Sequence, residues 1–310
     1  MKVLPEGEGQ SRYSNGSLDR DTCDGDNTRP SLPQMRNSMD NAWLTVERRD
    51  APLILSFPHT GTELPAPFDQ GLVSPWLAKR DADWWIERLY AFGRELGATV
   101  VHTAISRTVI DVNRDPTGAS LYPGQATTEL CPTTTFDGEP LYRQGAEPDA
   151  ASVAERRKLY FEPYHEAIGG ELARLRTLHE RVVLYDCHSI RSLILRLFEG
   201  ELPNFNIGTN DGRSCDPALT ASIEAICDAT DFSRVSNGRF KGGSITRTFG
   251  APHEGVHAIQ MELACRGYMR EPMPGVNEAN WPTPFEPAYA EPMSAALRKV
   301  LEACLVFAKG

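Results

Sequence analysis

The chain has 310 residues and a formal net charge of −10 at pH 7. No run of about eighteen apolar residues is present, and the N-terminus lacks the charged-then-apolar pattern of a secretion signal, which argues against a membrane span and against export. The acidic balance, without a cluster of Lys and Arg, argues against a nucleic-acid partner. Seven scattered cysteines without a CxxC pair indicate reduced thiols and a cytoplasmic protein.

The first 40 residues differ in composition from the rest of the chain. They are rich in Gly, Ser, Asp, Asn and Arg and poor in large apolar residues, so we expect a loosely ordered tail at 1–40. Residues 41–310 are expected to form a single α/β domain. Within it, residues 115–150 and 200–216 are rich in Pro, Gly, Thr and Asn, which predicts long loops of the kind that often carry function.

Strand-like and helix-like segments alternate through this domain. Short apolar or β-branched runs predict strands, and apolar residues at helical spacing predict helices. The expected strands are 53–57, 98–103, 108–112, 182–185 and 256–263, and the expected helices are 83–97, 151–180, 216–230 and 286–308. This alternation is typical of an α/β fold with a mixed, mostly parallel sheet flanked by helices.

Residues suited to chemistry stand at or just after the ends of several expected strands. In open α/β sheets, ligands bind outside the carboxyl ends of the strands. The side chains concerned are His59, Asn113, Arg114, His188 and Glu262. We therefore expect these side chains to gather at one edge of the sheet, where they would form the functional site.

His59 and His188 are the natural candidates for metal ligands. A catalytic zinc ion takes three protein ligands and keeps one position open for water. The third ligand would be a carboxylate, either Asp83 or Glu63, although Asp83 also suits a helix N-cap and Glu63 a loop charge. Asp186, two residues before His188 on the same strand face, would be a ligand or would orient a histidine.

Acidic and basic side chains around these histidines suit hydrolysis of an anionic substrate. Glu262 stands in an apolar strand, where a glutamate is costly unless it is paired or functional, and it would act as a general base for water or form a strand-end salt bridge. Arg107 and Arg114 would lie about 23 Å apart on an extended strand, so a bend is needed to bring both to one site. Arg191 and the turn at Gly243 would supply further contacts to substrate carboxylates.

Several motifs occur in an order that resembles the N-formylglutamate amidohydrolase family. They are Ser56–Gly61, Asp81–Trp84, Ser106–Arg114, Leu121–Gln125, Asp186–Ser192, Asn206–Thr209 and Gly255–Glu262. The resemblance covers about residues 50–275, and the same set of residues also resembles aspartoacylases and zinc carboxypeptidases. It implies a zinc carboxypeptidase-like fold and a zinc-dependent enzyme that hydrolyses N-formyl-L-glutamate to formate and glutamate in histidine degradation.

The resemblance also implies a role for each candidate residue. His59, Asp83 and His188 would bind one zinc ion, Asn113 and Arg114 would hold the substrate α-carboxylate, Arg107 would contact the scissile carbonyl, and Glu262 would activate water. Asp83 is preferred to Glu63 because it keeps the family's spacing to the Ser-Arg motif. Thr62 departs from the carboxypeptidase pattern, which has an acidic ligand at that position, so the third ligand stays open.

Three other interpretations compete with this one. Cys187 beside His188 would suit a thiol hydrolase, but neighbours in a strand point to opposite faces and cannot form a nucleophile–base pair directly. The substrate would alternatively be another N-acyl amino acid, such as acetylaspartate, or a peptide C-terminus. A protein that binds a small molecule without turnover is the third alternative.

Overall fold

The computed structural model describes residues 42–119, 124 and 126–310. The expected tail at 1–40 and the motif Leu121–Gln125, apart from Gly124, lie outside the described residues. These described residues belong to one compact unit. Among the described residues, no helix has both the length and the apolar character needed to cross a membrane.

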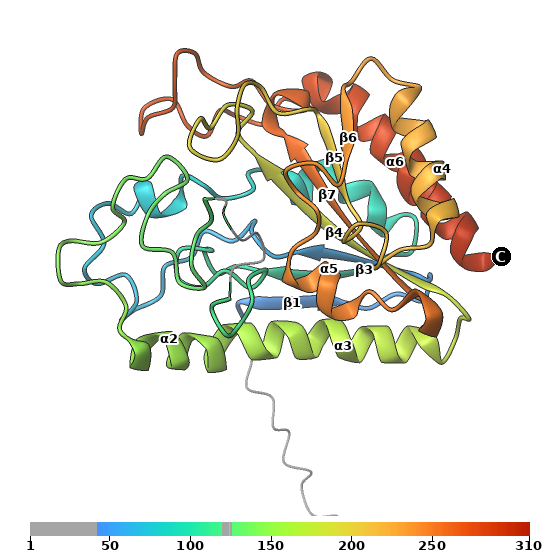
Figure 1. Cartoon of the computed structure of the whole chain (residues 1–310), viewed down its shortest axis with the longest axis horizontal. Coiled ribbons are helices and arrows are strands. Elements are labelled where there is room, and N and C mark those ends of the chain that lie inside the picture. The colour runs from blue at the N-terminus through green and yellow to red at the C-terminus, as the bar shows by residue number, and fades with distance from the viewer. Residues whose placement is uncertain (1–41, 120–123, 125) are drawn as a thin grey trace, which may run out of the picture. The chain divides into compact units, whose positions relative to one another are not determined.

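A seven-stranded sheet organises this unit, in the order β1-β3-β2-β4-β7-β5-β6 (Figure 1). The strands are β1 (Leu44–Glu47), β2 (Leu53–Phe57), β3 (Thr99–Thr103), β4 (Val182–Ile190), β5 (Phe205–Gly208), β6 (Arg234–Ser236) and β7 (Val256–Ala264). β3, β2, β4 and β7 pair in parallel, as do β5 and β6, whereas β1–β3 and β5–β7 are antiparallel. The predicted α/β fold with a mixed, mostly parallel sheet is confirmed.

Helices flank this sheet. The α-helices are α1 (Ile86–Leu89), α2 (Ala150–Arg156), α3 (Glu162–Arg176), α4 (Pro217–Asp228), α5 (Ser244–Phe249) and α6 (Pro287–Lys309). A π-helical turn, η3 (Arg157–Phe161), joins α2 to α3, and short 3-10 turns are η1 (Leu77–Lys79), η2 (Ala91–Arg94), η4 (Pro252–Glu254) and η5 (Cys265–Gly267). The expected helices at 151–180, 216–230 and 286–308 are confirmed, with α2, η3 and α3 forming the first.

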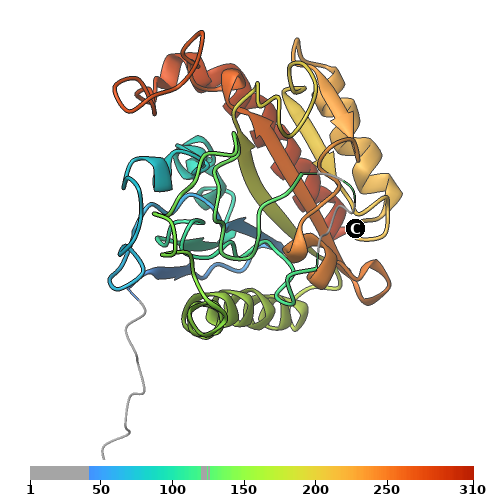
Figure 2. The same cartoon turned by 60° about the vertical axis from the view of Figure 1, so that its left-hand side comes forward.

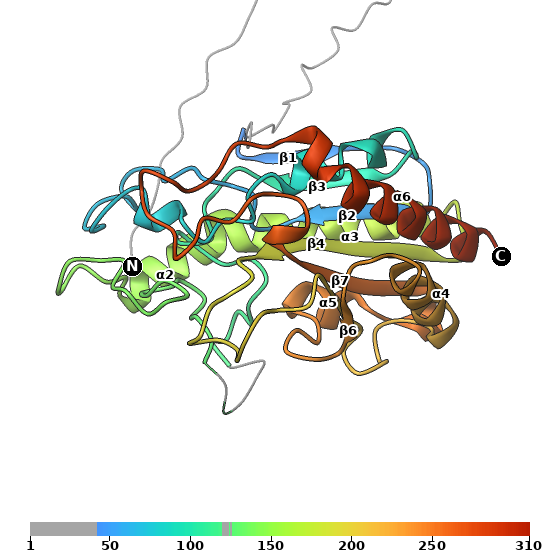
Figure 3. The ribbon, with the colours of Figure 1, turned by 90° about the horizontal axis from the view of Figure 1, so that it is seen from above.

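The alternation of side chains along β2 divides the core into two layers. Leu53, Leu55 and Phe57 belong to a buried cluster with α4 and α6, whereas Ile54 belongs to a cluster with α3 and α5, because successive residues of a strand face opposite sides of the sheet. Figure 2 shows α3 along one face of the sheet and α6 against the other. Figure 3 shows that α6 runs along β4.

The segment 83–97 is not the continuous helix that its spacing predicted. α1 begins after Trp85, whose φ of 64° is left-handed, and η2 follows as a separate turn. This conformation is strained for a bulky residue, and Trp85 Nε1 secures it by donating to the carbonyl of Thr283 at 2.8 Å. Asp83 therefore lies before the helix without capping it, and its carboxylate turns toward the sheet edge.

The segment 108–112 is not a strand, although its apolar residues are buried. Val109 N donates to the carbonyl of Ser106 at 2.9 Å within a turn, and Asp111 N donates to the carbonyl of Leu130 at 2.7 Å, outside any strand. The hydroxyls of Ser106 and Thr108 both donate to the carbonyl of Ala78, at 3.0 and 2.7 Å. The apolar side chains of this segment are buried although its main chain forms turns. Periodicity alone does not distinguish such a segment from a buried strand.

Three strands and one α-helix were not predicted. β1, β6 and α5 are short, and β5 lies inside the segment 200–216 that was expected to be a loop. Strands of three or four residues at a sheet margin carry too few side chains for a period of two to stand out. The expected loop at 115–150 does lack helix and strand in its described residues until α2 begins.

The segment 76–85 is tied to the C-terminal part of the chain. Trp281 Nε1 donates to the carbonyl of Arg80 at 2.9 Å, across 201 positions in sequence. The Tyr268 hydroxyl donates to the carbonyl of Trp84 at 2.7 Å, across 184 positions. These hydrogen bonds flank Asp83 on both sides and fix where its carboxylate lies.

Candidate active site

The candidate site lies where the carboxyl ends of β2, β4 and β7 meet. His59 follows β2 by two residues, whereas His188 stands inside β4, which continues beyond the expected 182–185. Glu262 on β7 is the partner of His188 in the parallel pairing of the two strands. The strand ends thus bring these three residues together as predicted, while Asn113 and Arg114 arrive on a turn.

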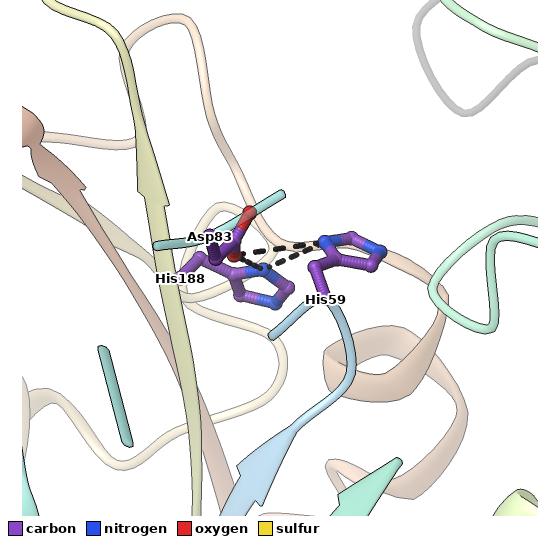
Figure 4. A group of neighbouring side chains, drawn as sticks. All are labelled: His59, Asp83 and His188. Carbon is purple, nitrogen blue, oxygen red and sulfur yellow. Dashed lines mark hydrogen bonds and ion pairs between the residues drawn. The ribbon is translucent and has the colours of Figure 1, made fainter. Parts of the chain in front are cut away.

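His59, Asp83 and His188 form a buried group of metal-binding side chains that point toward one another (Figure 4). The two ring Nδ1 atoms lie 3.1 Å apart, and Asp83 Oδ2 lies 3.1 Å from the His188 Nδ1 and 3.7 Å from the His59 Nδ1. The main chain fixes Asp83, because its N–H donates to the His59 carbonyl at 2.9 Å and its Oδ2 accepts from Ser189 N at 3.1 Å.

The donor set of this group fits a zinc ion. Tetrahedral zinc with bonds of about 2.1 Å has ligand atoms about 3.4 Å apart, and the three donor distances of 3.1, 3.1 and 3.7 Å bracket that spacing. The second oxygen of Asp83, Oδ1, is buried and accepts no hydrogen bond from the described residues. Glu63, the other carboxylate considered, is exposed and lies outside the group, where its main chain forms a β-bridge with Ile105.

Two further carboxylates orient the histidine rings. His59 Nε2 lies 2.7 Å from Asp111 Oδ1, and His188 Nε2 lies 2.9 Å from Asp186 Oδ2. A proton on each Nε2 leaves the Nδ1 lone pair directed into the group, as is usual for metal-binding histidines. Ser56 Oγ donates to the other oxygen of Asp186 at 2.8 Å and holds it in place. Of the two roles considered for Asp186, these contacts support the orienting one.

Arg107 and Arg114 converge on Asp111. Their Nη2 atoms lie 2.5 and 3.5 Å from Asp111 Oδ2, so the extended separation of about 23 Å does not arise, because the segment folds into turns. Burial alone would raise the pKa of Asp111, but the two guanidinium groups outweigh it and hold that pKa well below its usual range. Arg107 Nη1 also lies 3.8 Å from Asp83 Oδ1, which places a permanent cation beside the metal-binding group.

Glu262 is a buried carboxyl group of the site. Burial raises the pKa of its carboxyl group to about 7. The charges of His188 and Arg107 oppose this rise, and that of Asp83 adds to it. Gln260 Nε2 donates to Glu262 Oε2 at 3.1 Å and orients the carboxylate. A carboxyl group that titrates near neutrality can accept a proton in one step and return it in the next.

Asn113 lines the cavity at the site, and its side-chain amide makes contacts with other residues of the protein. Nδ2 lies 3.0 Å from Asp186 Oδ2 and 2.9 Å from His188 Nε2, and Oδ1 accepts from Ile245 N at 2.8 Å. Gly243 packs against this amide so closely that a Cβ there would lie 2.4 Å from Asn113 Oδ1. Asn113 Nδ2 donates to the carboxylate that orients His188, so Asn113 helps to hold Asp186 in place, and its role as a substrate ligand stays a prediction.

Replacing Gly243 with alanine is expected to lower Tm by about 2–10 °C, because overpacking costs about 1–3 kcal/mol. The new methyl group would displace the Asn113 side chain from its three partners. Thermal unfolding followed by circular dichroism measures the shift. Gly170→Ala in α3 is the matched control, since a Cβ there meets no atom within 4 Å and alanine favours a helix. A Gly243→Ala protein with the same Tm as the wild type would contradict this packing.

Arg191 does not reach the cavity. Its Nη2 lies 3.2 Å from Asp81 Oδ1 and 2.6 Å from Asp137 Oδ2. Arg80 joins the same cluster, with its Nη2 at 2.8 Å from Asp137 Oδ2. The structure therefore places Arg191 in an ion-pair cluster beside the site and does not bear out a contact with substrate, because its side chain is directed at Asp81 and Asp137.

One cavity brings the candidate residues together. Its lining residues are His59, Arg107, Asn113, Arg114, Ala126, Thr127, Thr128, Phe136, His188, Ile190, Leu197, Arg239, Phe240, Gly243, Gln260 and Glu262. Phe136, Arg239 and Gln260 were not predicted. Gln260 has a recognisable signal, because it precedes Glu262 by two residues on a strand and so shares its face. Phe136 and Arg239 stand on loops, where no periodicity marks them.

Cys187 lies outside this cavity. Its side chain belongs to the buried cluster that packs against α4 and α6, on the sheet face opposite His188. Burial raises the pKa of its thiol well above the usual range, and the charge of Asp186 adds to that rise. A reactive thiolate needs the opposite environment, so the contacts of Cys187 disfavour the thiol-hydrolase interpretation.

The sequence is similar to those of known proteins over most of its length. A family model described as N-formylglutamate amidohydrolase matches residues 51–269. An N-formylglutamate deformylase from Pseudomonas aeruginosa is 46% identical over 267 residues, which cover 86% of this chain and 97% of that protein. An N-formylglutamate deformylase from Pseudomonas putida is 44% identical over 269 residues, which cover 85% of this chain and 96% of that protein.

Solved structures share the fold. The N-formylglutamate amidohydrolase from Ralstonia eutropha superposes with a TM-score of 0.66 at 23% identity, covering 86% of this chain and 97% of that one. A gene product of Agrobacterium tumefaciens gives a TM-score of 0.61 at 17% identity, covering 85% of this chain and 94% of that one. Relatives this distant in sequence support the architecture alone, whereas the family model and the two Pseudomonas proteins match the sequence itself. The chain therefore belongs to the N-formylglutamate amidohydrolase family.

Proposed function

We propose that this protein hydrolyses N-formyl-L-glutamate to formate and L-glutamate, with one zinc ion held by His59, Asp83 and His188. The observation that carries the proposal is the position of Glu262, which pairs with His188 across β4 and β7 and lines the same cavity as His59 and His188. The names of the two Pseudomonas relatives support the choice of substrate. The buried donor set supports the choice of metal.

The reaction follows from the positions of these side chains. A zinc ion bound there would polarise the acyl oxygen and lower the pKa of a water molecule. Glu262, as a carboxylate, accepts a proton from the water that attacks the formyl carbon. It then donates this proton to the amine nitrogen as the C–N bond breaks, which releases formate and glutamate. Arg107 stabilises the negative charge that develops on the acyl oxygen, an effect worth about 3 kcal/mol per donor in other hydrolases.

The substrate carries two carboxylates, and the cavity offers cations for them. Arg114 is positioned by Thr128, whose Oγ1 accepts from Nη2 at 3.1 Å. Arg239 is positioned by main-chain carbonyls, with Nε at 2.9 Å from Leu197 O and Nη2 at 2.8 Å from Ala126 O. Guanidinium groups fixed in this way pair well with carboxylates. We infer that Arg114 and Arg239 hold the carboxylates of the substrate.

Formate release from N-formyl-L-glutamate tests the proposal. The purified protein is assayed as prepared, after removal of metal with a chelator, and after zinc is restored. Activity that is lost on chelation and recovered with zinc is expected. Activity that survives complete metal removal would contradict the metal dependence, and a zinc-loaded protein that releases no formate would contradict the substrate.

Replacing Arg239 with glutamine is expected to raise KM for N-formyl-L-glutamate about tenfold or more, because a hydrogen bond to a charged group contributes about 1.5–3 kcal/mol. The effect on kcat should be smaller, since Arg239 contacts the part of the substrate that does not react. Steady-state kinetics measures both constants. Arg213→Gln is the control, because this exposed arginine lies outside the cavity. A larger fall in kcat than rise in KM would contradict the assignment.

The proposed reaction also suggests a metabolic pathway and a cellular compartment for the protein. The family resemblance supports a place in histidine degradation, which generates N-formylglutamate. Six cysteines among the described residues are buried free thiols, which supports a reducing compartment such as the cytoplasm. The proposed partner is a small anionic molecule, and the acidic net charge of −10 supports neither a nucleic acid nor an anionic membrane surface.

A further inference from the structure

Phe136 forms an apolar wall of the cavity next to Arg107. The Arg107 guanidinium lies 4.7 Å from the centre of the Phe136 ring, and Phe136 is only 6% exposed. Ile190, which follows His188 by two residues on β4, lines the same cavity and belongs to the same apolar cluster as Phe136. The metal-binding group and Arg107 therefore adjoin a hydrocarbon surface on this side.

The cavity also has cationic and polar lining residues. Arg114 and Arg239 line it, together with Thr128 and the turn at Gly243. The cavity thus combines cations with an aromatic ring and an aliphatic side chain, and the Phe136 ring lies beside Arg107. A substrate whose carboxylates meet the cations directs its acyl group toward Arg107, and so toward Phe136.

Phe136 is held at both ends of its backbone. Its N–H donates to Asp81 Oδ2 at 2.7 Å, and its carbonyl accepts from Arg196 Nη1 at 3.4 Å. Arg191 binds Asp81 and also Asp137, the residue that follows Phe136. The ion pairs that keep Arg191 away from the substrate therefore fix the loop that carries this aromatic wall.

We propose that Phe136 is a specificity-determining residue that restricts the acyl group of the substrate to formyl, an inference that rests on the proposed hydrolysis of N-formyl-L-glutamate. The formyl carbon carries only a hydrogen where an acetyl group carries a methyl. The scissile carbonyl meets Arg107, and Phe136 covers one face of that guanidinium, so a methyl group on the same carbon meets the ring. The hydrogen bond from Phe136 N to Asp81, and the ion pairs of Arg191 with Asp81 and Asp137, hold the main chain that carries the ring in place.

The test compares two substrates that differ by this methyl group. kcat/KM is measured with N-formyl-L-glutamate and N-acetyl-L-glutamate for the wild type and for Phe136→Ala, by release of formate or acetate. The formyl-to-acetyl ratio is expected to fall at least tenfold in the variant, which is within the range by which one methyl group discriminates in other enzymes. Phe136→Leu, which keeps an apolar side chain in the cluster, is expected to lower the ratio in the same direction.

Phe240→Ala is the matched control. Phe240 lines the same cavity and packs against the same apolar cluster, but its ring lies beside Arg239, at 5.3 Å, rather than beside Arg107. Its replacement is expected to leave the formyl-to-acetyl ratio within about twofold of wild type, well inside the tenfold change that one methyl group can produce. A ratio that is unchanged in both Phe136 variants, or that falls equally in Phe240→Ala, would overturn the inference even with hydrolysis of N-formyl-L-glutamate established.

Binding separates this inference from the proposed function. The dissociation constant of N-acetyl-L-glutamate is measured by calorimetry on the zinc-loaded wild type and on Phe136→Leu. Tighter binding to the variant by about tenfold supports the role of Phe136, whether or not the wild type releases formate. Equal binding to both proteins counts against it. Absence of formate release by the wild type would by itself overturn only the proposed function.

Discussion

Replacing Glu262 with glutamine is expected to lower kcat for N-formyl-L-glutamate about a thousandfold while the protein keeps its zinc. General base catalysis contributes about 10²–10⁴-fold in enzymes, and an amide cannot accept the proton. Glutamine matches glutamate in size, and its oxygen can still accept from Gln260 Nε2, which lies 3.1 Å from Glu262 Oε2. The fold around β7 should therefore survive. Steady-state formate release and the zinc content of the purified variant measure the two quantities.

A half-buried glutamate, Glu271, provides the control for this experiment. Burial also raises the pKa of Glu271, but its Oε1 accepts from Ser192 N at 2.8 Å and it does not line the cavity. Glu271→Gln is expected to keep kcat within a few-fold of wild type. Loss of zinc from Glu262→Gln would show that Glu262 is a ligand, and an unchanged kcat would show that another group activates the water.

Replacing Asp83 with alanine is expected to abolish stoichiometric zinc binding and to lower activity by at least a thousandfold. The side chain supplies one of three donors, and removing it leaves His59 and His188 as a two-ligand site, which catalytic zinc centres do not use. It also leaves Ser189 N without the acceptor that lies 3.1 Å away. Zinc content after dialysis against buffered metal, together with formate release, measures the loss.

Glu63→Ala is the matched comparison for Asp83→Ala. Glu63 was the rival third ligand because it follows His59 by four residues, but it is exposed and outside the group of donors. Its replacement should leave zinc content and activity near wild type. The opposite pattern, with zinc lost from Glu63→Ala and retained by Asp83→Ala, would reverse the assignment of the third ligand.

The parts of the site that the sequence predicts are those attached to the parallel strands. His59, His188 and Glu262 could be placed together because β2, β4 and β7 are parallel and their carboxyl ends meet at one edge. Asp186 could be placed on the face of His188 because side chains alternate along a strand. The position of each residue then follows from strand geometry alone.

The remaining parts depend on turns and on contacts between distant segments. Asp111 was read as part of a strand, whereas the turn around it brings Arg107 and Arg114 onto one carboxylate oxygen. Arg191 has a charge that suits substrate binding, but its guanidinium group is ion-paired with Asp81 and Asp137. The first outcome depends on a turn that a strand-like period conceals, and the second on partners that stand 110 and 54 positions from Arg191 in sequence.

The ties between segment 76–85 and the C-terminal region bear on when the site can form during synthesis. A nascent chain that has emerged through β4 already contains His59, Asp83 and His188. It still lacks Tyr268 and Trp281, whose hydrogen bonds flank Asp83 across 184 and 201 positions. Contacts so far apart in sequence form late, because the intervening chain must first be ordered. The ribosome therefore exposes all three donors well before the molecule can align them, and a zinc ion bound as proposed would reach its final geometry only once the last part of the chain has folded.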